Sequence, residues 1–553
     1  MSVIKTRIGI AVLLLAGFLT SRAQGQQYSW QHLPQINEPV FKKDTINILK
    51  YGAKADGITL NTTSINKAIS ACSAKGGGVV LIPQGLWLTG PLVMKSNVNL
   101  HVSRAALLQF TGDKTQYKLV EGNYEGHAAV RNESPISGTN LTNIAITGEG
   151  IIDGHGEVWR AISKDRLTEA EWKKLVASGG VVSENGRSWY PSESYVKGLK
   201  APGAGVIGNG KTIKDNEPFK DFFRPNMLVL TNCKKVLLQG VTLQNSPAWD
   251  IHTLLCEDLT VQNARVRNPW NAQNGDGIDV ESCRNVLIEG STFDAGDDGI
   301  CIKSGRDEEG RKRGMPTENV IVRDNIVYRA HGGFVIGSEM SGGARNIFVS
   351  NCTFIGTDIG LRFKTTRGRG GVVENIFIKN ISMRDIAHEA ILFDMYYSGK
   401  SPGESDDVNN QVIMPVTEAT PSFRKFYVDN VVCNGAEKAL MIRGLPEMGI
   451  KDIHIENSTF KTVKGADVIE AQNIFLKNIC FKSKETNPLI SIQNSNNVTF
   501  NHIIYTDTRL LFKISGKRSR QIKLLDTDAA KAKKKVEFVS GASENALTGT
   551  NNE

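Results

Sequence analysis

Short strands with alternating apolar and polar residues recur along most of the chain. Each begins with a polar residue followed by an aliphatic or aromatic one, as at Asn285-Val286, Asn319-Val320, Asn346-Ile347 and Asn375-Ile376. Most successive copies lie 21 to 29 residues apart, and no strong helical period intervenes. Ten or more such units predict an all-β fold, a single-stranded right-handed parallel β-helix in which each repeat forms one coil. Leucine-rich repeats have a similar period, but they need a fixed leucine pattern that this chain lacks.

One helix and two irregular stretches interrupt this pattern. Ile65, Ala68, Ile69 and Cys72 follow helical spacing, and we expect their helix to cap the open end of the solenoid within about residues 45–100. A Gly-rich, aromatic insertion is expected at about 157–222, after which the coils resume. The solenoid is expected to span 45–540, followed by a disordered tail at 541–553.

The first residues resemble an export signal. Lys5 and Arg7 precede a 12-residue apolar run, which is too short to span a membrane. We therefore expect a signal peptide at 1–23, an N-terminal arm at 24–44, and a periplasmic or secreted protein. No later stretch is long and apolar enough for a membrane span, so no membrane association is expected.

Charge and cysteine content narrow the choice of partner. The formal net charge is +9, and the first 23 residues carry three basic groups and no acid. A moderately basic exported protein favours an acidic polysaccharide over nucleic acid, although solubility alone explains such a charge equally well. Cys233, Cys256 and Cys283 each stand two residues before a repeat start, which predicts a buried thiol ladder on adjacent coils; a disulfide within it remains open.

Ionisable residues recur at coil spacing in one part of the chain. Asp297 and His331 each lie 12 residues after a repeat start, so equal offsets should stack them on one face. Two cations two residues apart on a strand should point the same way. The pattern therefore predicts one exposed patch, made of Asp276, Asp297, Asp298, His331, Arg362 and Lys364.

Such a patch is suited to glycosidic hydrolysis. One carboxylic acid protonates the leaving oxygen while another carboxylate activates water, and crowding of carboxylates raises the pKa of one of them. Arg362 and Lys364 would bind a sugar carboxylate. The flanking Gly296 and Gly299 should let Asp297 and Asp298 face the same side. Asp279 is interpreted as structural, and no metal or cofactor is expected.

These motifs resemble glycoside hydrolase family 28, the polygalacturonases and their relatives. The family's Asn-Thr-Asp, Asp-Asp, Gly-His-Gly and Arg-Ile-Lys motifs correspond in order to Asn274-Gly275-Asp276, Asp297-Asp298, Ala330-His331-Gly332 and Arg362-Phe363-Lys364. The functional residues match and only spacer residues differ. The likeness extends from about residue 45 to 505, and the motifs together are highly specific.

The resemblance implies hydrolysis of α-1,4-galacturonosidic bonds with inversion. Asp297 would be the general acid, Asp276 and Asp298 would deprotonate water, and His331 would support the acid or contact sugar. Asn274 belongs to the first motif and would bind substrate. A family tyrosine near the leaving group would match Tyr396 or Tyr397, of which Tyr396 is the preferred candidate. Inverting geometry predicts carboxyl groups about 6.5–9.5 Å apart.

Alternatives to this activity remain open at this level. The large insertion resembles those of exo-acting bacterial members, so we expect an exo-acting enzyme working as a monomer on acidic polysaccharide or oligogalacturonide. Retention of His331, Arg362 and Lys364 favours galacturonate over the rhamnose-bearing pectin backbone. A Ca²⁺-dependent pectate lyase would also use a parallel β-helix, and its carboxylates would hold the cation. A non-catalytic carbohydrate-binding solenoid is the third possibility.

Overall fold

The computed structural model describes residues 28–207, 212–397, 408–409 and 411–549, and the expected signal peptide at 1–23 lies outside them. The chain divides into two units, residues 1–35 and 36–553. In the described part of the first unit, Ser29 and His32 close a turn by mutual backbone hydrogen bonds of 3.0 and 3.1 Å. All that follows concerns the second unit.

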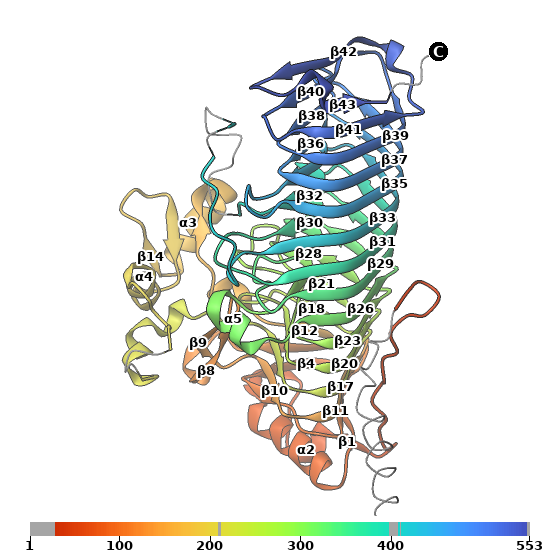
Figure 1. Cartoon of the computed structure of the whole chain (residues 1–553). Helices are drawn as coiled ribbons and strands as arrows, with labels where there is room; N and C mark the ends of the chain where they lie inside the picture. The colour runs from red at the N-terminus through yellow and green to blue at the C-terminus, as the bar shows by residue number, and fades with distance from the viewer. Residues whose placement is uncertain (1–27, 208–211, 398–407, 410, 550–553) are drawn as a thin grey trace, which may run out of the picture. The chain divides into compact units, whose positions relative to one another are not determined.

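Two long sheets of parallel strands stack coil upon coil, as expected for a right-handed parallel β-helix (Figure 1). Every pairing within these two sheets is parallel over the described residues. The 14 strands of the first, called sheet A, are β5 (Leu92–Val93), β10 (Ile136–Thr139), β16 (Leu228–Thr231), β19 (Ile251–Leu254), β22 (Ile278–Glu281), β25 (Asp298–Lys303), β28 (Gly332–Ile336), β30 (Ile359–Lys364), β32 (Glu389–Asp394), β34 (Lys438–Arg443), β36 (Lys464–Ile469), β38 (Ile490–Gln493), β40 (Thr508–Ser515) and β42 (Ala532–Val539).

The second sheet, called sheet B, forms the other walls of the coils. Its 24 strands are β1 (Thr45–Asn47), β2 (Asp56–Leu60), β3 (Gly78–Ile82), β4 (Gly85–Thr89), β6 (Val98–Val102), β7 (Ala106–Phe110), β11 (Thr142–Gly148), β12 (Ile151–Asp153), β17 (Lys234–Gln239), β18 (Thr242–Gln244), β20 (Glu257–Gln262), β21 (Arg265–Arg267), β23 (Arg284–Glu289), β24 (Thr292–Asp294), β26 (Thr317–Arg323), β27 (Ile326–Tyr328), β29 (Ala344–Ile355), β31 (Val372–Arg384), β33 (Ser422–Asn434), β35 (Ile450–Thr462), β37 (Ala471–Ser483), β39 (Asn496–Tyr505), β41 (Arg520–Leu525) and β43 (Leu547–Thr548).

Polar residues recur at the start of each repeat because the backbone there adopts a particular conformation. Asn285, Asn319 and Asn346 all adopt left-handed backbone, with φ of 56°, 59° and 55°. Asparagine tolerates this region better than most residues. Its side chain also bonds along the stack: Asn319 Nδ2 donates to Asn285 Oδ1, and Asn346 Nδ2 to Asn319 Oδ1, both at 3.1 Å. The repeat spacing therefore reports a turn geometry and an amide ladder together.

Side-chain alternation along the strands of sheet A separates a core from an outer face. Ile300 and Ile302 point into the cylinder and are fully buried, and their register partners Phe334 and Ile336 continue the interior stack. Residues between them point outward, where they can meet a ligand. Cys233, Cys256 and Cys283 are buried, as predicted, and all eight cysteines are free.

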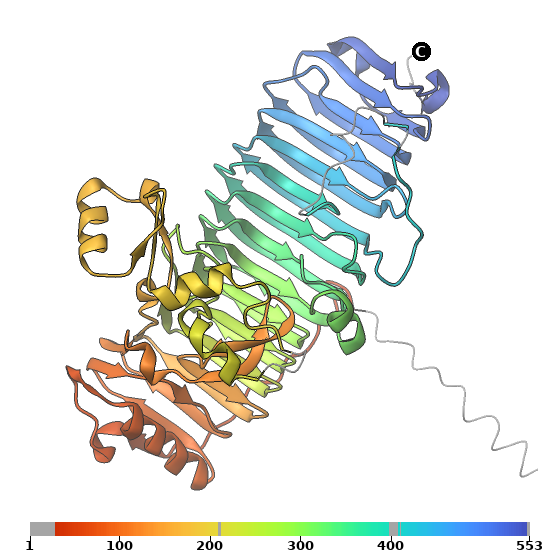
Figure 2. The same ribbon diagram turned by 90° about the vertical axis from the view of Figure 1, so that its left-hand side faces the viewer.

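A helix lies at the N-terminal end of the coils, and two helices with a small sheet lie in the segment after β12. Helix α2 (Thr62–Ala74) buries Ile65, Ala68, Ile69 and Cys72 at the N-terminal end of the coils (Figure 1). The insertion after β12 holds α3 (Glu169–Ala177), α4 (Glu193–Lys200) and the small sheet of β13 (Ile162–Ser163), β14 (Val181–Val182) and β15 (Ser188–Tyr190), and it projects beside the lower coils (Figure 2).

The sequence predicts a disordered tail from residue 541, whereas the structure places residues up to 549 and ends in a strand. Leu547–Thr548 pair with β41, and Ala546 is only 2% exposed. Burial of these apolar residues over the last coil holds the segment to the fold. None of the helices in the described part of the chain has the length and apolarity needed to cross a lipid bilayer.

Candidate active site

The predicted patch lies on the outer face of sheet A, over β22, β25, β28 and β30. Asp276 lies in the loop before β22, and Asp297 and Asp298 stand at the start of β25. The backbone N–H of His331 donates to Asp297 O at 2.8 Å, and its Nδ1 lies 3.1 Å from Asp297 Oδ1. The equal sequence offsets therefore do stack these two residues on neighbouring coils.

The three aspartates gather as expected. One carboxylate oxygen from each of Asp276, Asp297 and Asp298 lies within 4.8 Å of the others. Asp276 and Asp298 are 3% and 1% exposed, whereas Asp297 is half-buried and faces the pocket.

Close packing, rather than bending, explains the glycines around them. A Cβ at Gly296 would lie 2.5 Å from Ala272 O, and one at Gly299 would lie 2.4 Å from a Val327 methyl carbon. Neither glycine appears among the positions of positive φ. Both are needed because the loop before β22 and the strand β27 press against this turn.

The carboxylate oxygens are closer than the 6.5–9.5 Å expected for inversion. Asp297 and Asp298 are adjacent in sequence, and Asp276 lies one coil away, where strands are about 4.8 Å apart. Coil spacing thus sets the nearest approach of these oxygens. This short approach is nearer the separation of about 5–5.5 Å found in retaining enzymes, so inversion has to be tested by the stereochemistry of the product.

Arg362 and Lys364 have a different partner from the one expected. Arg362 Nη1 donates to Asp298 Oδ1 at 3.0 Å, and Lys364 Nζ donates to Asp298 Oδ2 at 2.7 Å. Burial opposes ionisation of Asp298, but Lys364 and Arg362 outweigh it and hold its pKa below the ordinary value. In this ligand-free structure the two cations thus fix Asp298 as a buried anion. Arg362 Nε has no acceptor among the described residues and keeps a donor for a further group.

The neighbouring acids are shifted the other way. Burial, followed by repulsion from Asp279 and Asp297, raises the pKa of Asp276 well above its ordinary value. Burial also raises the pKa of Asp279 to about 8, although Lys303 opposes the shift from 3.5 Å. The hydrogen bond with Asp297 raises the pKa of His331. The site therefore combines one fixed anion with groups that retain protons.

The tyrosine assignment is corrected by the structure. The ring of Tyr397 lies 4.9 Å from Lys364 Nζ and 5.8 Å from the Arg362 guanidinium, and it lines the pocket. Tyr396 is 7% exposed and packs instead beneath Arg367 and Arg443, at 5.4 and 5.9 Å. Neighbouring residues after a strand point to different sides, so only one of the two reaches the site.

Asn274 lies at the pocket but is already engaged. Its Oδ1 accepts a 2.8 Å hydrogen bond from Arg224 Nη2, while Arg224 Nη1 donates to Gln273 O at 2.6 Å. Arg224 thus anchors the loop that presents Asp276. The Asn274 amide nitrogen is the group left to meet a ligand.

The pocket encloses about 260 Å³ and includes charged residues that the motifs do not contain. Lys303 is 4% exposed, lies 3.1 Å from Glu339, and stands 4.9 Å from the ring centre of Trp249. Because side chains alternate along β25, the sequence alone could have predicted that Lys303 lies on the outer face of sheet A. The other lining residues outside the motifs are Glu125, Trp249, Arg306, Ser338, Glu339 and Arg369.

A bonded contact, called the clasp, forms one wall of the pocket. It joins the tip of the hairpin β8 (Leu119–Tyr124) and β9 (His127–Asn132) to α5 (Asp307–Arg313) and the residue before it. Arg306 donates from its backbone to Gly126 O at 3.2 Å and from Nη1 to Glu125 Oε2 at 3.1 Å. Ala128 N donates to Glu309 Oε1 at 3.0 Å.

The carboxylates are poorly suited to a divalent cation. Asp276, Asp297 and Asp298 are close enough to bind one. However, both oxygens of Asp298 are bound by Arg362 and Lys364, and those two positive charges would repel a metal ion at short range. The donor set therefore does not fit the Ca²⁺ that a pectate lyase would need.

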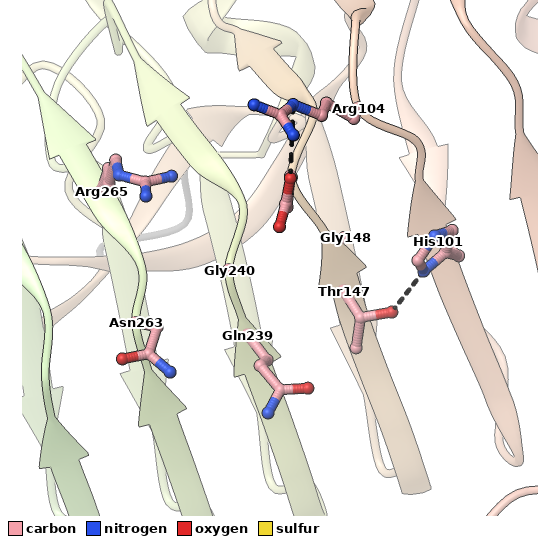
Figure 3. Close-up of a pocket in the computed structure, with 9 residues that line it drawn as sticks. His101, Arg104, Thr147, Gly148, Gln239, Gly240, Asn263 and Arg265 are labelled. Atoms are coloured by element: carbon pink, nitrogen blue, oxygen red, sulfur yellow. Dashed lines mark hydrogen bonds and ion pairs between the residues drawn. The ribbon is translucent and has the colours of Figure 1, made fainter.

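A larger hollow on sheet B lacks this chemistry. It encloses about 530 Å³ above β6, β11, β17 and β20 (Figure 3). Glu149 is the only carboxylate among the residues lining it, and it pairs with Arg104 at 3.6 Å. Without a second acid the hollow cannot perform acid–base hydrolysis, so the site on sheet A is the candidate.

Comparison with known proteins agrees with this geometry. The model of the glycosyl hydrolases family 28 matches residues 174–434, which contain every residue of the predicted patch. A solved hyperthermoactive exopolygalacturonase from Thermotoga maritima is 30% identical, covers 85% of this chain and 93% of its own, and superposes with a TM-score of 0.63. The chain belongs to glycosyl hydrolase family 28.

Curated members of the family show similar likeness. An exo-poly-alpha-D-galacturonosidase from Dickeya chrysanthemi is 28% identical over 72% of this chain and 64% of its own length. A probable polygalacturonase from Vitis vinifera is 26% identical over 81% of both chains. The family 28 chain described here is thus a glycoside hydrolase.

Proposed function

We propose that this family 28 enzyme hydrolyses α-1,4-galacturonosidic bonds of polygalacturonate, releasing products from a chain end. The observation that carries the proposal is the trio of aspartates with unequal protonation. Asp298 is held as an anion by two cations, while burial, followed by repulsion from Asp279 and Asp297, raises the pKa of Asp276 and favours a proton there. A donor of a proton and an acceptor of one thus lie within a few ångströms.

Asp297 is the aspartate of the three that is suited to be the general acid. It is the most exposed of the three, and His331 can replace its proton through the 3.1 Å contact. Asp297 would protonate the glycosidic oxygen as the bond from C1 to that oxygen breaks. Asp298 would accept the proton of a water that Asp276 helps to hold, while the water oxygen bonds to C1. Attack from the opposite side would invert the anomeric centre.

The proposed receptor for the substrate's carboxylate is Arg362, which lies beside the pocket next to its lining residues Lys364 and Tyr397. Arg362 Nε has no acceptor among the described residues, and Tyr397 packs against both Arg362 and Lys364. A galacturonate carboxylate would accept from Arg362 without displacing Asp298. This role extends the one expected from sequence, because the same guanidinium serves the enzyme's carboxylate and the substrate's.

The clasp supports exo action. Glu125 and Arg306 line the catalytic pocket, and the hairpin and α5 also line a separate cavity over β10, β16 and β19 of the same sheet. The outer face of sheet A is therefore divided beside the aspartates, where an endo-acting enzyme needs a continuous groove. Product analysis tests this: monogalacturonate or one short oligomer should dominate early, and an early ladder of oligomers would reject chain-end action.

The acid–base assignment is tested by Asp297→Asn against Asp294→Asn. Both change one carboxylate, but Asp294 lies on sheet B and pairs with Arg329. We expect Asp297→Asn to lose at least about 10³-fold in kcat with an unchanged thermal midpoint, and Asp294→Asn to remain active. Equal activity of the two variants would refute the assignment. Proton NMR of the first-formed anomer tests inversion independently.

Hydrolysis of a branched pectin is the second candidate. A model described as rhamnogalacturonase A/epimerase, pectate lyase-like, matches residues 45–245, which precede the aspartates. Thin-layer analysis of products from polygalacturonate and from rhamnogalacturonan would decide between the two substrates. The basic charge and the export-like leader support an acidic polysaccharide met in the periplasm or outside the cell, and we expect a monomer.

A further inference from the structure

A second cavity lies behind the clasp on the same outer face of sheet A. It encloses about 590 Å³, within the range of small-molecule sites. Its floor is formed by outward residues of β10, β16 and β19, including Thr139, Thr231 and His252. The register continues to the catalytic coils, since His252 pairs with Asp279 and Asp279 with Cys301.

An aromatic wall separates this cavity from the aspartates. Tyr124 stacks on Trp249 with ring centres 5.6 Å apart, and Trp249 is 2% exposed. Trp249 contacts His252 on the cavity side, at 5.0 Å between ring centres, and Lys303 on the catalytic side, at 4.9 Å. The two cavities are thus neighbours with separate linings.

The cavity presents polar groups that lack partners. The side-chain oxygens of Asn123, Asn132 and Asn226 are buried and accept no hydrogen bond from any described residue. Asn132 and Asn226 are only 1% and 4% exposed, so these acceptors are shielded from bulk water. Buried acceptors without donors are costly, so a ligand that donates hydrogen bonds would be stabilised here.

The unpaired charges that line the cavity are predominantly negative. Glu281 lies at the rear and contacts His252 at 2.9 Å and Arg313 at 2.6 Å. Arg131 packs over the Tyr124 ring at 3.9 Å and pairs with no carboxylate among the described residues. Glu121 and Glu133 pair with no cation in the described part of the chain. A uronate carboxylate would meet the unpaired carboxylates of Glu121 and Glu133 against one unpaired cation, Arg131, whereas hydroxyl groups would meet the three amide oxygens.

We propose that this cavity is a binding site for a neutral sugar residue, distinct from the catalytic pocket. Hydroxyl donors would bind Asn123, Asn132 and Asn226, and the apolar face of the ring would pack on Val229 and Leu254 of the floor. The sugar can be a free monosaccharide or a neutral residue carried by a pectic chain. Both sources offer the same hydroxyl groups and ring face, and the experiment below is designed to distinguish them.

Binding without turnover tests the site in the full chain. Isothermal titration would use galactose, xylose, arabinose and rhamnose, an oligogalacturonide bearing neutral branches, and galacturonate for comparison. Thr231→Phe fills the cavity from the floor, where an aromatic residue suits a strand. Thr499→Phe, at a half-buried position of β39 on sheet B, is the matched control.

At least one neutral sugar, free or branched, should bind to the wild-type chain and to Thr499→Phe. Thr231→Phe should weaken that binding at least about tenfold, and Asn123→Ala, which leaves the strands intact, should weaken it as well. Binding only of the branched oligosaccharide would identify a pectic chain as the source. Binding of galacturonate alone, or a crystal soaked with sugar that shows ordered water only, would overturn the proposal. Hydrolysis of polygalacturonate is measured separately, so a failure of sugar binding at this cavity can be told apart from a failure of the proposed catalytic function.

Discussion

Replacing Lys364 by glutamine should remove one of the two cations that neutralise the buried Asp298 carboxylate. Lys364 Nζ and Asp298 Oδ2 are 2.7 Å apart, and the two residues are 5% and 1% exposed. Two charges at this distance attract by about 6 kcal/mol with an effective dielectric constant of 20. Arg362 remains 3.0 Å from the other oxygen, so part of the stabilisation persists. We expect a loss of about 3–5 kcal/mol in the free energy of unfolding at pH 7.

The loss should depend on pH in a defined direction. The pKa of Asp298 lies below its unfolded value of about 3.9, so the native ion pair stabilises the fold above that pH. The contribution disappears as pH falls through the native pKa. In Lys364→Gln the native pKa of Asp298 should rise. The difference from wild type should therefore be full at pH 7 and should shrink below about pH 4.

Urea unfolding at pH 7, 5 and 3.5 measures this difference, with the exposed Lys523→Gln as the matched control. The acid limb of the kcat profile should move to higher pH in Lys364→Gln, because Asp298 then protonates within the working range. Combining Lys364→Gln with Asp298→Asn should recover part of the stability, since the buried carboxylate is removed and only Arg362, at 15% side-chain exposure, then lacks its partner. A loss independent of pH, or additive in the double variant, would refute the reasoning.

Three other changes follow from the same geometry. Tyr397→Ala should lower kcat/KM about tenfold by loosening Arg362, while Tyr396→Phe should not, and steady-state kinetics on polygalacturonate compares them. Arg306→Ala removes the ion pair with Glu125 in the clasp, and chromatography of early digests should then show longer products. Asp279 keeps its proton in the native state up to about pH 8. The free energy of unfolding of the wild type should therefore fall as pH rises from about 4 to 8, by at most about 6 kcal/mol. Thermal unfolding of Asp279→Asn should show a flatter dependence on pH.

The sequence predicted the fold because one local requirement repeats in every coil. Asn285, Asn319 and Asn346 mark left-handed turns, and their side chains bond to each other along the stack. Because each asparagine both adopts the turn conformation and bonds to the next coil, the same residue recurs at each repeat. That recurrence can be recognised in the sequence without any knowledge of packing. The same regular offsets placed His331 beside Asp297, which the structure confirms.

The partners of the site residues could not be predicted in the same way. Arg362 lies in register with Val335 and Cys301, not with His331, so its reach to Asp298 depends on side-chain length and direction. The choice between Tyr396 and Tyr397 depends on how the chain leaves β32. Glu125 and Arg306 are 181 residues apart and follow no repeat, so their contact has no signal in a single sequence.

Coil stacking ultimately explains the electrostatics of the site. Residues on consecutive coils are separated by about one strand spacing, so acids placed at equal offsets must lie close together. Asp276, Asp297 and Asp298 cannot all ionise at that distance unless cations compensate. Arg362 and Lys364 contact Asp298, whereas burial and repulsion from neighbouring carboxylates raise the pKa of Asp276, which favours a proton there. The division between proton donor and proton acceptor therefore follows from where the next coil places its cations.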